Sequence, residues 1–75
     1  MNEEILIDAR FLEPPEPFVQ TMEALDHLQV GGRIRLLLYR EPFPLYAALR
    51  QNGFTHQLNM EPDGTFVICI QHRLP

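Results

Sequence analysis

The segment from Asp8 to Pro17 constrains the fold most, because it joins a short apolar run to an amphipathic run through three prolines and two glutamates. Proline is accepted in the first turn of a helix, where its missing N–H would have no partner. We therefore expect a helix that starts near Pro15. Glu13 and Glu16 then lie at the positive end of the helix dipole, and no nucleophile stands at the helix start.

The flanking residues predict a strand before this helix and an apolar stripe along it. Ile5 to Ile7 are typical of a short strand that ends at Asp8. Apolar residues recur at helical spacing after Pro17, and they are Phe18, Met22, Leu25 and Leu28. We expect the segment Val30 to Gly32 to stop the helix.

The second half of the chain repeats the alternation of strand and helix. Its expected elements are a strand over 33–39, a helix that opens at 41–44 and ends at Asn52 and Gly53, a strand over 55–60, a turn at 61–64 and a strand over 65–71. Period-two alternation places two sets of residues on one face of the sheet: Ile34, Leu36 and Leu38, and Phe66, Ile68 and Ile70.

The order βαβαββ predicts a single domain over residues 1–75, an α/β (α+β) two-layer sandwich with two helices on one face of a four-stranded mixed sheet. A right-handed crossover makes the first two strands parallel, and the last two form an antiparallel hairpin. The expected strand order is 1-2-4-3.

Composition excludes several function classes. The chain has no serine, lysine or tryptophan, which removes a serine nucleophile, a lysine Schiff base and a P-loop lysine. The net charge of −4 counts against nucleic-acid binding. No apolar run is long enough to span a bilayer, the acidic N-terminus is unlike a signal peptide, and a single cysteine forms no internal disulfide. We expect a cytoplasmic protein without a cofactor.

The element order and the opening segment IDARFLEPPEP together resemble the TusA/SirA-like superfamily of small prokaryotic sulfur carriers. The signature of that superfamily reads roughly LDxRGLxCPxP, and the matching residues here are Asp8, Arg10, Leu12, Pro15 and Pro17. Phe11 replaces the glycine of the signature and Pro14 replaces its cysteine. Three further segments, 40–46, 52–56 and 61–70, are most similar to the cysteine-less, uncharacterised branch of the superfamily. Many members of that branch read DHDPxPL where this chain reads YREPFPL over 39–45.

The replacement at residue 14 determines what the resemblance implies about function. In the carriers, a thiol at this helix start has its pKa lowered by the dipole and carries a persulfide. Pro14 has no thiol, so we expect the chain neither to accept nor to donate sulfur there. The resemblance therefore favours a small, non-enzymatic interaction module.

The candidate contact surface is the sheet edge at which both helices begin, the usual ligand crevice of open α/β sheets. We expect it to bind a protein partner or a small charged ligand. Its candidate residues are Arg10, Glu13, Pro14, Pro15, Glu16, Pro17, Arg40 and Glu41. In the alternative reading, Asp8 and Arg10 only brace the loop, and the glutamates only serve the helix dipoles.

A second candidate surface is the sheet face without helices. Strand parity places Leu37, Tyr39, Val67 and Cys69 there, as one apolar patch on two neighbouring strands. Such a patch predicts a protein partner or a weak homo-oligomer, and the alternative is a small apolar area on a monomer.

Two other functions stay open. Cys69 is the chain's single thiol, so a sulfur-relay or redox role would depend on it, although a structural cysteine in mid-strand is the simpler reading. RNA binding is the second alternative, since the C-terminal domain of a translation initiation factor shares this topology.

The histidines and aromatic residues give weaker signals. His27, His56 and His72 are expected at the edge opposite the prolines, but their spacing does not predict a metal site. Three aromatic residues either line a cofactor pocket or simply pack, and they are Tyr39, Phe43 and Tyr46.

Overall fold

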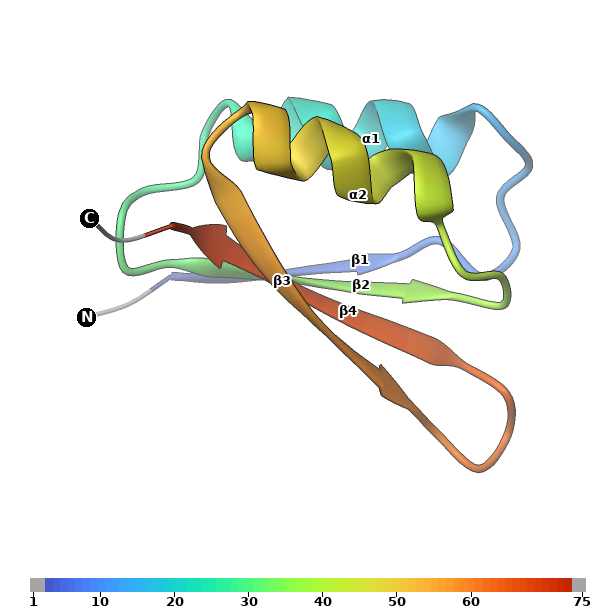
Figure 1. The fold of residues 1–75 in the computed structure, drawn as a ribbon. Coiled ribbons are helices and arrows are strands. Elements are labelled where there is room, and N and C mark those ends of the chain that lie inside the picture. The colour runs from blue at the N-terminus through green and yellow to red at the C-terminus, as the bar shows by residue number, and fades with distance from the viewer. Residues whose placement is uncertain (1–2, 74–75) are drawn as a thin grey trace.

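Four strands and two helices follow one another in the expected order (Figure 1). They are β1 (Glu4–Asp8), α1 (Glu16–Leu25), β2 (Arg33–Leu38), α2 (Phe43–Gln51), β3 (Phe54–Met60) and β4 (Phe66–His72). This computed structural model describes residues 3–73. Residues 1–2, where the acidic N-terminal segment begins, and residues 74–75 lie outside the described part.

The four strands form one mixed sheet in the order β1-β2-β4-β3, which confirms the predicted topology. β1 runs parallel to β2, with Ile5 opposite Ile34 and Ile7 opposite Leu36. β4 is antiparallel to both β2 and β3. Figure 1 shows α1 and α2 side by side on the same face of the sheet, which leaves the other face without helices.

The core lies between the sheet and the two helices. The predicted core residues of β2 and most of those of β4 are buried, namely Ile34, Leu36, Leu38, Ile68 and Ile70. One face of α2 is also buried and contributes Leu45 and Leu49. Removal of this apolar surface from water is the main favourable term in folding such a small domain.

The first helix is shorter than predicted. It ends at Leu25, well before Val30, and the expected stop at Val30 to Gly32 is therefore wrong. After Leu25 the chain changes to tighter bonds three residues apart, because the amide of His27 donates to Ala24 O at 3.1 Å and that of Leu28 donates to Leu25 O at 3.2 Å. Leu28 is nevertheless buried, as a loop residue rather than a helical one.

The predicted apolar stripe is confirmed at Met22 and Leu25, which pack in the core, but it is wrong at Phe18. Phe18 is exposed, whereas Thr21 is completely buried beside Leu25. A threonine is tolerated there because its hydroxyl donates to Pro17 O at 2.8 Å, four residues earlier. The true stripe therefore begins at Thr21, and the first turn of α1 is free to serve another surface.

Two glycines at the expected helix end and turn have positive φ angles. Gly53 follows α2 with φ 83° and Gly64 closes the turn between β3 and β4 with φ 92°. Side chains other than hydrogen are strained at such angles. Within residues 3–73, no helix is long and apolar enough to cross a membrane.

Truncation of a leucine to alanine should cost more stability at a buried position than at an exposed one. Leu49→Ala removes a completely buried side chain and should lower the free energy of unfolding by about 2–5 kcal/mol. Leu6→Ala removes a side chain that is 62% exposed and should change it by less than about 1 kcal/mol. Urea denaturation followed by circular dichroism measures both, and similar losses would contradict this packing.

Candidate functional site

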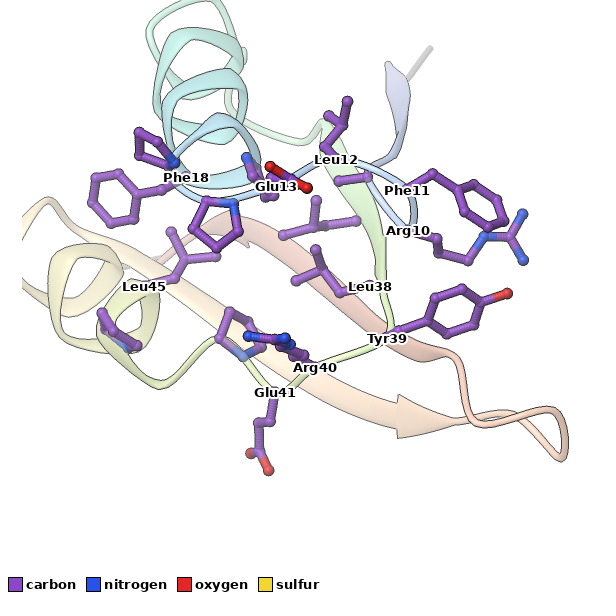
Figure 2. Close-up of a pocket in the computed structure, with 17 residues that line it drawn as sticks. Arg10, Phe11, Leu12, Glu13, Phe18, Leu38, Tyr39, Arg40, Glu41 and Leu45 are labelled. Carbon is purple, nitrogen blue, oxygen red and sulfur yellow. The ribbon is translucent and has the colours of Figure 1, made fainter.

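A groove lies at the sheet edge where β1 and β2 end and both helices begin (Figure 2). Its volume is about 710 Å³, within the range of roughly 300–1,000 Å³ that is usual for ligand pockets. The parallel pairing of β1 with β2 creates this position, because it brings the loops after both strands to one edge.

The groove gathers most of the residues predicted for this edge. Those that line it are Arg10, Glu13, Pro14, Pro15, Pro17, Arg40 and Glu41. Glu16 is the exception, since it begins α1 as an exposed residue outside the lining. Whether these residues bind anything stays a prediction.

Sequence reasoning missed the apolar floor and rim of the groove. The floor consists of buried core residues, namely Ala9, Leu36, Leu38 and Leu45. The rim is exposed and apolar: Phe11 is 81% accessible and Phe18 is 40% accessible, and Leu12 and Tyr39 are also exposed. The sequence offered one signal for the rim: Phe11 is an aromatic residue directly after Arg10, in a loop rather than in a strand.

Asp8 and Arg10 brace the loop between β1 and α1. Arg10 Nε donates to Asp8 Oδ1 at 2.9 Å and Arg10 Nη2 donates to Oδ2 at 2.8 Å, which is a two-pronged ion pair. The hydrogen bond from the Arg10 side chain, followed by that from its backbone amide, lowers the pKa of Asp8. Hydrogen bonding to Asp8 likewise raises the pKa of Arg10. Asp8 and Arg10 therefore do brace the loop, as the alternative reading of the sequence expected.

An aromatic contact extends the braced loop to the end of β2. The rings of Phe11 and Tyr39 meet edge to face with 5.7 Å between centroids. The guanidinium of Arg10 lies 6.0 Å from the centre of the Tyr39 ring. Figure 2 shows these three side chains together at one end of the groove.

The two helix starts offer few amide donors to the groove. At α1, Glu16 donates to Glu13 O, Pro17 has no N–H, and Val19 donates to Pro15 O. At α2, Phe43 donates to Glu41 O, Pro44 has no N–H, and Leu45 donates to Pro42 O. Anion sites at helix starts depend on free amides, so prolines and local bonds leave little of that capacity here.

Three charged side chains of the lining are not held by ion pairs within residues 3–73: Glu13, Arg40 and Glu41. Glu41 Oε2 instead accepts a hydrogen bond from the Tyr46 hydroxyl at 3.2 Å. Burial, together with this bond, raises the pKa of Tyr46 to about 12. The Tyr46 ring stacks on His56, with 4.1 Å between centroids, and meets Phe43 edge to face.

The histidines occupy separate environments. His27 is exposed after α1, His56 packs on Tyr46, and His72 Nε2 lies 2.7 Å from Leu28 O. In the described part of the chain, no three side chains of metal-ligating type are grouped to hold an ion. Of the three aromatic residues considered for a cofactor pocket, only Tyr39 lines the groove.

The sheet face without helices, called here the open sheet face, carries the second set of predicted residues. Leu37 lies directly opposite Val67, and Cys69 lies between Arg35 and Gln57. Val67 is only 4% accessible, so it adds little free surface, whereas Leu6 opposite Arg35 is exposed on the same face. Tyr39 packs against Phe11 and is shared with the groove. The role of this face as an interface stays a prediction.

The Asp8–Arg10 pair predicts a measurable titration. In Arg10→Gln the pKa of Asp8 should rise toward its ordinary value, as followed by carboxyl ¹³C NMR. Asp63 is the internal control, because the backbone amide of Thr65 is the main cause of its lowered pKa, and it should move little. Because the folded pKa of Asp8 is lowered, the stability that the pair adds should be lost as the pH falls below about 4. An unchanged Asp8, or equal movement of Asp63, would contradict the pairing.

Comparison with known proteins adds one finding. The family described as "Uncharacterized conserved protein (DUF2249)" matches residues 6–72, nearly the whole chain. Neither a curated protein nor a solved structure matches the chain significantly. On the strength of this match over both helices and nearly the entire sheet, the chain belongs to the DUF2249 family.

Proposed function

We propose that the protein is a non-enzymatic interaction module that binds a protein partner or a small charged ligand in the groove at the helix starts. The observation that carries this proposal is the exposed apolar rim above a buried apolar floor, with Phe11 and Phe18 on the rim and Leu45 on the floor. Exposed apolar surface around a concavity often marks a binding site, since its coverage removes that surface from water.

The chemistry of the lining supports binding rather than catalysis. The 17 residues that line the groove include no cysteine, serine, threonine, histidine or lysine. Its two carboxylates come from Glu13 and Glu41, and in Figure 2 Glu41 points out of the groove. A hydrolytic pair would need both carboxyl groups to face one bond of a substrate.

A kinship with the TusA/SirA-like carriers remains part of this proposal. The βαβαββ order, the Asp8–Arg10 pair and the prolines before α1 support it. Pro14 lies in the loop just before α1, where the carriers would place their thiol. We accordingly place the module in a prokaryotic cytoplasm, with its one cysteine reduced.

The two rival functions have less support. Cys69 lies in the middle of β4, half-buried and away from either helix start, which is unlike a sulfur-relay thiol. RNA binding needs a basic surface, and the chain has six arginines against ten acids.

Charge placed on the rim tests the proposed contact surface. Leu12→Glu with Phe18→Glu puts two carboxylates where a bound molecule would exclude water, so retention should fall at least about tenfold. The matched control is Val30→Glu with Leu58→Glu, at exposed apolar positions outside the groove.

Parent, rim variant and control are immobilised and exposed to extract of the source organism. Retained proteins and small molecules are then identified by mass spectrometry. We expect a binder that the parent and the control retain and the rim variant loses. Equal retention by all three proteins, or no specific binder on the parent, would refute the proposed function.

The open sheet face is proposed as a second contact, for weak self-association. The parent's mean mass in sedimentation equilibrium should rise with concentration, and Leu37→Glu should abolish the rise. Because Leu37 is half-buried, Leu6→Glu on the same face provides a variant less disruptive to folding. A parent that stays monomeric, or an oligomer that is indifferent to both changes, would refute this contact.

A further inference from the structure

We propose that the occupant of the groove is an extended peptide segment of a partner protein, with basic residues beside apolar ones. This inference rests on the proposed function and narrows it to one class of occupant. The shape of the apolar rim, the scarcity of free amides at the helix starts and the balance of charge carry it.

The rim favours a long occupant over a compact one. Figure 2 shows Phe18 at one end of the groove and Phe11 with Tyr39 at the other, and the floor residues Leu38 and Leu45 lie between them. A compact molecule on the floor would leave Phe11, which is 81% accessible, uncovered. A peptide segment that runs along the groove covers both ends, as in other modes of peptide recognition by apolar grooves.

The helix starts argue against an anionic occupant. The first three residues of α2 carry two amides, those of Phe43 and Leu45. Both already donate to carbonyls within the turn, and Pro44 has no N–H. At α1 the amides of Glu16 and Val19 are likewise bonded to nearby carbonyls and Pro17 has no N–H, which leaves the Phe18 amide as the donor of the first turn without a local bond within residues 3–73. A phosphate or carboxylate would meet prolines where it needs N–H donors.

The charges near the groove favour a cationic occupant. Arg10 is neutralised by Asp8, so Arg40 is the one guanidinium of the lining that has no ion pair within residues 3–73. Against it stands the carboxylate of Glu13 in the lining. Two further carboxylates lie at its margin: Glu41 points outward in Figure 2, and Glu16 lies at the start of α1 between two lining prolines. The excess is acidic, and so is the whole chain at −4. Long-range attraction therefore favours lysine and arginine in the partner.

These observations specify the segment. Its apolar side chains cover the floor and the rim, and its basic side chains lie along the α1 side, near Glu13 and Glu16. Ion pairs at such exposed sites are individually weak and are screened by salt. Affinity therefore comes mainly from apolar contact, and the glutamates select basic sequences.

A random-peptide library tests the inference directly. Phage-displayed random 12-residue peptides are selected on the full chain in low salt, and the enriched peptides are synthesised for fluorescence anisotropy. We expect enriched sequences that combine apolar residues with arginine or lysine. Glu13→Gln with Glu16→Gln should weaken their binding about three- to tenfold, and the difference should shrink in 1 M salt.

The control variant makes the same charge change elsewhere on the first helical segment. Glu23→Gln with Asp26→Asn removes two carboxylates at the far end of α1 and should change the affinity much less. Circular dichroism checks that all variants are folded. Equal weakening by both double variants would refute selection by Glu13 and Glu16.

The remaining outcomes separate this inference from the proposed function. Acidic or uncharged peptides whose binding is lost in Leu12→Glu with Phe18→Glu would overturn the basic segment and keep the groove as a binding site. A library that yields no groove-dependent peptide would overturn the peptide occupant, while retention of a small molecule in the extract experiment would still uphold the module.

Discussion

The parallel pairing of β1 with β2 is the constraint on which the site depends. Because the two strands run the same way, the loops that follow Asp8 and Leu38 leave the sheet at the same edge. Each loop then enters a helix on the same face of the sheet, so the two proline-rich helix starts face each other across the groove. With an antiparallel pair they would lie at opposite edges, and no groove would form between them.

Proline determines the character of that edge. Parallel α/β sheets commonly present free amides at this position, and a thiol or an anion is stabilised there. Here Pro17 and Pro44 remove donors within the first turns, and local bonds use most of the others. The same geometry that suits charged chemistry thus becomes a concave apolar surface.

The sequence was sufficient for the fold because its signals were local and agreed with one another. Alternation in β2 and β4, and glycines at 53 and 64, all favoured the same topology. The failures concern α1. Phe18 fitted a core stripe by spacing, yet it lies on the groove rim. Thr21 was overlooked because the bond that permits its burial, to Pro17 O, depends on where the helix begins.

The candidate site was predicted in position but not in composition. Charged and proline residues at a loop are visible in a sequence, so Arg10, Glu13 and Arg40 were placed at the right edge. The floor was not visible, because Leu36 and Leu38 look like ordinary core residues of β2. Their role depends on an opening above them, and such an opening is set by how far apart two helix starts lie rather than by any residue type.

Arg10 illustrates why the sequence left bracing and recognition as alternatives for one residue. A guanidinium that holds a carboxylate with two hydrogen bonds gives up much of its capacity for a second anion. By pairing with Asp8 at 2.8 and 2.9 Å, Arg10 fixes the wall that carries Phe11 and removes its own charge from the groove. The bracing role therefore leaves Arg10 with fewer donors for an anionic ligand than an unpaired arginine would have. It also leaves Glu13 without a compensating cation from its own loop.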